Sequence, residues 1–256
     1  MPRPYIHDFV PPNIINNNSS SNDERIDFSQ YDRIIAFGDS LIAQLVRRYS
    51  GEGSWSDNIL WYQNVCQCLS SDQDANDMIH KLHSRHGHQI RRQTKHNARI
   101  ALITGSSSWD AMRGCVHEDL QDHINAIRTF IQNVTTSYPN VHIYWKAPSA
   151  FFLHRYTTYI DAFNETYFQT LKPKYGIVPL KPRYINYHVP LQLHRVQKDL
   201  MTKELNIPYL DLYDSFYLSA PLTIPGDARH FDDTLTRLQL SYYWPGLLNQ
   251  PIYVKS

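Results

Sequence analysis

Short apolar runs recur along the chain at intervals that predict buried strands. The four clearest runs are RIIAFG (33–38), ARIALIT (98–104), VHIYWK (141–146) and IPYLDLY (207–213). Each is short and rich in Val, Ile, Leu and Tyr, which is typical of parallel strands covered on both faces. A further strand is expected between Gly51 and Cys68, where the pattern does not define its bounds.

Helical periodicity separates these strands. The segments that show it are 40–50, 118–136, 187–205 and 232–243, the last of which ends before Pro245. In the second segment the apolar residues on one face are Leu120, Ile124, Ile127 and Ile131. Strands that alternate with helices predict crossover connections and a mainly parallel sheet covered on both faces. The predicted fold class is therefore α/β, with about five strands.

The first 28 residues differ in composition from the rest of the chain. They are rich in Pro, Asn and Ser, which is typical of a disordered or loosely docked arm. Residues 29–256 are enough for one large α/β domain. The arm contains no apolar stretch of the kind found in a signal peptide, and no run in the sequence is long enough for a membrane-spanning helix.

Charge and cysteine content narrow the expected partners and compartment. A net charge of +1 gives no overall field that would hold nucleic acid or an anionic membrane. Three cysteines argue against a disulfide scaffold, although one bridge from Cys115 to Cys66 or Cys68 stays open. We expect a cytoplasmic protein. The secretory pathway also stays open, because four Asn residues lie in N-x-S/T triplets: Asn17, Asn18, Asn133 and Asn164.

The turn Gly38-Asp39-Ser40 is the first candidate for chemistry. Ser40 follows the first predicted strand and begins a predicted helix. Ligands of open α/β sheets bind at the carboxyl ends of strands, and a helix N-terminus offers unpaired N–H groups that can stabilise an oxyanion. This placement favours Ser40 as a nucleophile over a simple helix cap.

Asp227 and His230 are the candidates for the partners of this serine. A serine hydroxyl needs a general base near neutral pH, and a carboxylate commonly orients that base. Asp227 and His230 follow Pro225-Gly226, so they are expected in a turn after the last strand. Asp77 and His80 have the same spacing. We interpret that pair as chance, because it falls in a polar stretch with no predicted strand before it.

The segment IIAFGDSL (34–41) resembles the first signature block of the SGNH/GDSL hydrolase superfamily. Members of that superfamily also carry an Asp and a His three residues apart near the C-terminus, as Asp227 and His230 are here. The resemblance extends over about residues 33–245. It implies a three-layer α/β/α flavodoxin-like fold and a Ser40, Asp227 and His230 triad. It also implies catalysis without a metal or an organic cofactor.

The middle of the chain departs from the superfamily pattern. The superfamily usually has Gly-x-Asn-Asp here, whereas ITGSSSWDAM (103–112) has Gly105 and Asp110 but Trp109 in place of the Asn. A Trp-Asp pair at this place resembles the PC-esterase branch. Loss of an oxyanion donor typically costs about 10²–10³ in rate. A serine of this segment or backbone N–H groups near Ser40 and Leu41 could substitute, and an inactive member is the alternative. The candidate oxyanion and substrate-binding residues are Asp39, Leu41, Gly105, Ser107, Trp109 and Asp110.

The predicted function is hydrolysis of an O-acyl ester, with O-acetyl groups on sugars among the candidates through the PC-esterase resemblance. An O-acyltransferase with the same triad and an inactive binding protein are the alternatives. The expected partner is a small-molecule or glycan ester; the sequence does not indicate an oligomeric state. His80, His83 and His86 have helical spacing, yet we favour a solvated polar segment over a metal site for residues 79–96. That segment is basic but lacks aromatic residues, so nucleic-acid binding is not predicted.

Overall fold

The computed structural model describes residues 28–39, 42, 60–64, 68–106, 110, 120–149, 188–211 and 213. Within the predicted arm it describes Phe28 alone, which is buried and begins a short 3-10 helix, η2 (Phe28–Gln30). The rest of the arm and the helix predicted over 232–243 lie outside the described residues.

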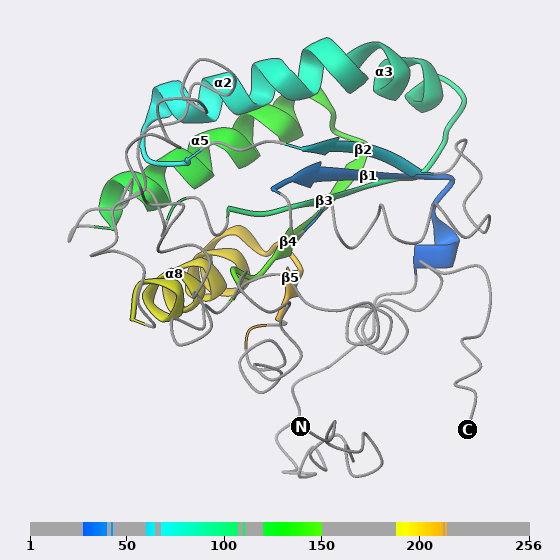
Figure 1. The fold of residues 1–256 in the computed structure, drawn as a ribbon. Helices are drawn as coiled ribbons and strands as arrows, with labels where there is room; N and C mark the ends of the chain where they lie inside the picture. The colour runs from blue at the N-terminus through cyan, green and yellow to red at the C-terminus, as the bar shows by residue number, and fades with distance from the viewer. Residues whose placement is uncertain are drawn as a thin grey trace, which may run out of the picture.

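Five parallel strands form the central sheet (Figure 1). They are β1 (Arg33–Gly38), β2 (Leu60–Asn64), β3 (Ile100–Thr104), β4 (Val141–Lys146) and β5 (Tyr209–Leu210). The order β2-β1-β3-β4-β5 is that of flavodoxin-like folds, and every neighbouring pair is parallel. The predicted fold class is confirmed, and β2 is the strand that the sequence could not place.

The strand bounds match the apolar runs closely in the middle of the sheet. β1 and β4 have the predicted bounds, and β3 begins two residues later than predicted. β5 is much shorter than the run over 207–213, because it pairs on one side only and Pro208 has no N–H to extend the ladder. Asn206 just before it adopts a left-handed conformation that ends the preceding helix.

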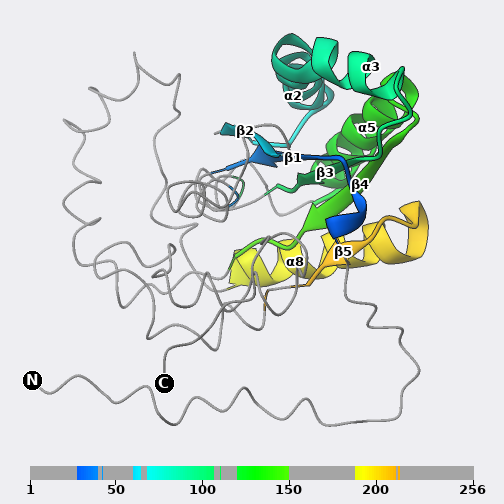
Figure 2. The same cartoon turned by 90° about the vertical axis from the view of Figure 1, so that its right-hand side faces the viewer.

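The described α- and π-helices lie on one side of the sheet (Figure 2). They are α2 (Asp72–Leu82), η3 (His83–Gly87), α3 (His88–Thr94), α5 (Gln121–Ser137), α8 (His188–Asp199) and η6 (Leu200–Leu205), of which η3 and η6 are π-helical. The helices predicted over 118–136 and 187–205 are thus confirmed as α5 and as α8 with η6. Within the described ranges, no helix combines the length and the apolar character needed to cross a bilayer.

One interpretation of the sequence was wrong. Residues 79–96 were expected to be a solvated polar segment, yet they form most of the run from α2 to α3, and Leu82, His86 and Ile90 are buried. A strand, β2, also precedes this segment, so the stated reason for setting aside Asp77 and His80 does not hold. Both residues are exposed on α2, and Asp77 accepts a hydrogen bond from Gln73.

Both faces of the sheet are buried, as the predicted three-layer arrangement requires. On the face toward α2 and α5, Phe37 stacks on Phe130, which in turn meets Trp145 edge-on. On the opposite face, Ile34 and Tyr144 are buried, and Tyr144 packs against the Phe28 ring at 5.0 Å between centroids. Apolar burial on both faces supplies most of the driving force that holds the strands in this order.

Candidate active site

The carboxyl ends of β1 and β3 mark the place where open α/β sheets of this order generally bind ligands. In the order β2-β1-β3-β4-β5 the connections leave β1 and β3 toward opposite edges, which makes their boundary the topological switch point. Gly38 and Asp39 end β1, and Gly105 and Ser106 follow β3 at the same edge. The sequence-predicted chemistry at Gly38–Ser40 and at Gly105–Asp110 thus begins at neighbouring strand ends.

The structure describes three of the nine predicted site residues: Asp39, Gly105 and Asp110. The proposed triad residues Ser40, Asp227 and His230 lie outside the described residues, as do Leu41, Ser107 and Trp109. The geometry of the triad therefore stays a prediction.

Asp39 is a buried carboxylate at the end of β1. It is 2% exposed, and one of its oxygens accepts a hydrogen bond from the backbone N–H of Ile42 at 3.3 Å. A side-chain oxygen that bonds the N–H three residues later is the N-cap arrangement of a helix start. The contact between Asp39 and Ile42 has this spacing; apart from Ile42, the helix predicted over 40–50 lies outside the described residues, so it stays a prediction.

Lys146, at the end of β4, is a functional candidate that the sequence interpretation missed. Its side chain is 2% exposed, and its ammonium donates to the carbonyl of Ala147 at 2.9 Å and to Ser149 Oγ at 3.4 Å. Burial lowers the pKa of Lys146 from 10.5 to about 8, while the negative charge of Asp39 acts in the opposite direction. A fully buried lysine is unusual, but its burial is a property of the fold that the sequence pattern does not reveal.

Gly105 lets the β3 and β4 ends approach closely. A Cβ at Gly105 would lie 2.5 Å from the backbone oxygen of Lys146, so any side chain there would push the two strand ends apart. The glycine of the middle block is thus required by packing, whatever further role it has toward a substrate.

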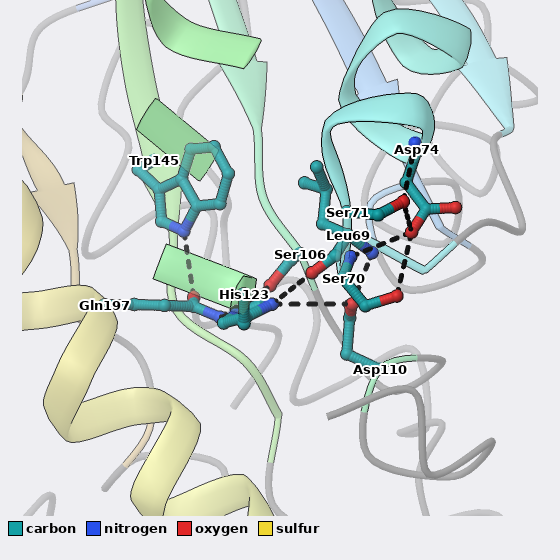
Figure 3. A network of polar contacts seen from close by, with 9 residues as sticks. All are labelled: Leu69, Ser70, Ser71, Asp74, Ser106, Asp110, His123, Trp145 and Gln197. Carbon is teal, nitrogen blue, oxygen red and sulfur yellow. Dashed lines mark hydrogen bonds and ion pairs between the residues drawn. The ribbon is translucent and has the colours of Figure 1, made fainter. Parts of the chain in front are cut away.

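Asp110 and His123 clamp the connection that follows β2 (Figure 3). The Leu69 N–H donates to Asp110 Oδ1 at 2.6 Å, and the Leu69 carbonyl accepts from His123 Nδ1 at 2.5 Å. Asp110 and His123 are almost fully buried, and His123 comes from α5. The observed contacts of Asp110 therefore fix a backbone segment, which is a positioning role.

Gln197 of α8 joins this clamp to β3 and β4 (Figure 3). Its Oε1 accepts from Trp145 Nε1 at 2.9 Å, and its Nε2 lies 2.5 Å from Ser106 Oγ and 3.0 Å from His123 Nε2. Because the indole N–H can only donate, the amide must direct its oxygen to Trp145 and its two N–H groups to the other partners. His123 Nε2 is then an acceptor, and the imidazole proton is on Nδ1.

Ser106, His123 and Asp110 have the composition of a catalytic triad, but their contacts are structural. The distance from Ser106 Oγ to His123 Nε2 is 3.3 Å, whereas His123 Nδ1 lies 3.8 Å from Asp110 and bonds the Leu69 carbonyl instead. The serine and the histidine are both buried and bonded to Gln197. A nucleophile needs access to its substrate, so this set is better explained as a buried network that fixes four elements.

No metal site is present in the part of the chain that the structure describes. Groups of three or more His, Cys, Asp or Glu side chains that could hold an ion do not occur there. His80 is exposed, while His83 packs edge-on against the Tyr138 ring and His86 bonds Gln89. The side chains of these three histidines therefore have different surroundings and do not form a common ligand set.

Sequence comparisons assign no family to this chain. No family model matches it, and no curated protein does. Similar solved structures include a candidate GDSL-like lipase from Parabacteroides merdae, with 11% identity and a TM-score of 0.46 over 83% of this chain and 95% of the other. Phospholipase PlaB from Legionella pneumophila has 12% identity and a TM-score of 0.27 over 63% of this chain and 34% of its own. Likenesses this distant assign no activity, and the fold class rests on the strand order described above.

Proposed function

We propose that this chain is a serine hydrolase of the SGNH/GDSL type that cleaves O-acyl esters. In this proposal Ser40 attacks the acyl carbon, His230 takes the serine proton and returns it to the leaving alcohol, and Asp227 orients His230. Water then attacks the acyl-enzyme, with His230 as the base, and releases the carboxylic acid.

The observation that carries the proposal is the position of Asp39 at the switch point of a flavodoxin-like sheet. The residue after Asp39 is Ser40, and the N-cap contact to Ile42 supports a helix start at this turn. In a capped first turn the bond from Ile42 leaves the N–H groups of the two preceding residues without helical partners. We propose that the N–H groups of Ser40 and Leu41 stabilise the oxyanion there.

Lys146 supports the same site electrostatically. A buried ammonium at the adjoining strand end places positive charge in a medium where charges interact more strongly than in water. The developing oxyanion is negative, so the ammonium favours the transition state to the extent that the opposite charge of Asp39 does not neutralise it.

The finer assignment to the PC-esterase-like branch rests on Trp109-Asp110 and on the sequence after β4. On that basis we propose a glycan or small-molecule acyl ester as substrate, with O-acetyl esters as the first to test. An O-acyltransferase uses the same first half-reaction and differs only in the acceptor of the acyl group. Product analysis with a glycan acceptor present separates the two activities.

Hydrolysis of p-nitrophenyl acetate by the full chain tests the proposal. Ser40→Ala is expected to lower kcat/KM by about 10³-fold or more and to abolish labelling by a fluorophosphonate probe. Ser84→Ala is the matched control, because Ser84 is exposed on η3 and its hydroxyl bonds the carbonyl of Lys81 on the same helical run. Equal hydrolysis by the Ser40→Ala variant and the wild type would remove Ser40 as the nucleophile, and absence of both activities in the wild type would favour the inactive binding protein.

We further propose an oxidising compartment for this protein, in place of the cytoplasm. Cys68 is disulfide-bonded, and structural disulfides persist in secreted and luminal proteins but are rare in the cytosol. Fractionation of cells that express the full chain tests this location.

A further inference from the structure

The segment from the end of α2 through α3 concentrates positive charge. Between Asp77 and Ile100 the chain has six Lys and Arg residues and no Asp or Glu, although the net charge of the whole chain is only +1. The cations are Lys81, Arg85, Arg91, Arg92, Lys95 and Arg99. So uneven a distribution directs a local field outward from one part of a nearly neutral protein.

Four of these cations form an exposed face that runs along η3 and α3 to the residue that caps α3. The inward side of the run is apolar or buried at Leu82 and Ile90, and the exposed positions include Arg85, Arg91, Arg92 and Lys95. Within the described part of the chain, none of these four side chains has an ion pair or a hydrogen bond. By contrast, Arg128, Lys198 and Lys203 each pair with a carboxylate.

The basic face lies away from the candidate active site. α3 ends at Thr94 and the chain enters β3 at Ile100, so this helix lies at the amino ends of the strands (Figure 1). Asp39 and Gly105 lie at the carboxyl ends. The basic face is therefore a separate surface, and its role does not depend on the hydrolase proposal.

We infer that this basic face, defined by Arg85, Arg91, Arg92 and Lys95, docks an anionic polysaccharide that carries sulfate or carboxylate groups. Guanidinium groups bind such oxyanions bidentately, and three of the four cations are arginines. Gln89 and Asn97 are exposed beside them and can bond sugar hydroxyls. A polysaccharide with regularly spaced anionic groups would thus contact both charged and neutral hydrogen-bonding side chains on this face.

The same face fits other polyanions less well. The apolar residues of the helix, Leu82 and Ile90, are buried in the core, so no apolar side is left to insert into a lipid interface. The exposed positions from Ser84 to Asn97 carry no Phe, Tyr or Trp side chain on which nucleic-acid bases could stack, although the imidazoles of His88 and His96 are exposed there. A bilayer surface would be held by charge alone, and a nucleic acid chiefly by charge.

Binding of a fluorescent, size-defined heparin fragment to the full chain tests this inference. The variant Arg85→Gln/Arg92→Gln/Lys95→Gln should weaken binding at physiological salt by roughly ten- to a hundredfold, because three exposed ion pairs are lost. The slope of log affinity against log salt should fall by about three, one for each contact. The control variant Arg128→Gln/Lys198→Gln/Lys203→Gln removes the same charge from paired cations and should bind like the wild type.

Each other outcome overturns the inference. Equal weakening in both triple variants would mean a non-specific charge effect, and absence of heparin binding by the wild type would remove the site. Tighter binding of duplex DNA, single-stranded RNA or phosphatidylserine vesicles than of heparin would replace the polysaccharide with that partner. Hydrolysis of p-nitrophenyl acetate is measured in parallel and should not change, so loss of docking is distinguished from failure of the proposed active site.

Discussion

At the scale of single residues, Lys146 is the side chain with the highest cost of burial in the described site. A charged group in the interior is tolerated only where bonds and opposite charges compensate its lost hydration. The carbonyl of Ala147 and the hydroxyl of Ser149 supply the bonds, and Asp39 supplies the charge. This arrangement makes the protonation of Lys146 a property that stability measurements can report.

We predict that the Lys146→Met substitution changes how stability depends on pH. The folded protein releases the lysine proton at a pH of about 8, while the unfolded chain keeps it to about 10.5. Between these values the unfolded state binds more protons, so the free energy of unfolding of the wild type rises with pH relative to that of the variant. The relative gain is on the order of 3 kcal/mol across this window.

Urea unfolding of both proteins from near-neutral to alkaline pH measures this difference. Lys203→Met serves as the control, because Lys203 is 70% exposed and should give a nearly constant difference from the wild type. A difference for Lys146→Met that stays flat over the same window would show that burial does not perturb this lysine.

At the scale of secondary-structure elements, one amide connects four segments. Gln197 links α8 to Trp145 of β4, to Ser106 after β3 and to His123 of α5. His123 and Asp110 in turn hold the Leu69 backbone after β2. The connections that follow β2 and β3 are therefore fixed to the helical layer by hydrogen bonds as well as by apolar packing.

We predict that Gln197→Leu destabilises the fold by about 3 kcal/mol or more. The leucine fills a similar volume but leaves the indole N–H, the imidazole and the serine hydroxyl without this partner, and each such buried group costs about 1–3 kcal/mol. Gln192→Leu on the same helix is exposed and should change stability by less than about 0.5 kcal/mol. Comparable midpoints of thermal unfolding for the two variants would argue against a cooperative network.

The same elements show what the sequence could and could not predict. Periodicity predicted β1 and β4 to the residue, because each is a short, mostly apolar run rich in Ile and aromatic residues. The segment 79–96 was misjudged because its buried side is narrow and lies within a strongly polar surface; the buried residues are Ile79, Leu82, His86, Gly87 and Ile90. Because most residues of this segment are polar, the helical spacing of its few buried positions was not recognised.

The buried network escaped prediction for a different reason. His123 lies on the apolar face of α5 beside Ile127 and Phe130, which marks it as a buried polar residue. Its partners come from residues up to 74 positions away, and local pattern carries no information about such pairings. Strand order and helix packing had to be known before Gln197 and Trp145 could be joined to it.

At the scale of the whole molecule, our proposals assign different functions to the carboxyl ends and the amino ends of the strands. The carboxyl edge collects Asp39, Gly105 and Lys146, where the chemistry is proposed. The amino edge carries the basic face of α3, where docking is proposed. An enzyme that holds a long polyanionic chain at one end of the sheet raises the local concentration of that chain's acyl groups at the other end, most strongly when the length of chain between them matches the distance between the two sites.

The last prediction concerns the disulfide at Cys68, namely which cysteine is its partner. Three cysteines allow Cys66 or Cys115 as the partner within one chain. Cys68 directly precedes Leu69, whose N–H is bonded to Asp110, and Cys115 follows Asp110 by five residues. We therefore expect Cys68 to pair with Cys115, so that the bridge joins the same two connections as the Leu69 clamp.

Alkylation by iodoacetamide of the denatured, unreduced protein identifies the pairing by intact mass. The wild type should accept one label, Cys115→Ser two and Cys66→Ser none. A bridge over this loop stabilises the fold by about 4 kcal/mol in the chain-entropy model, so reduction and Cys115→Ser should lower the free energy of unfolding by similar amounts. A bridge to Cys66 would instead give two labels in Cys66→Ser. Reduction would then leave the free energy of unfolding almost unchanged, because this bridge would close a loop of only a few residues and constrain the unfolded chain very little.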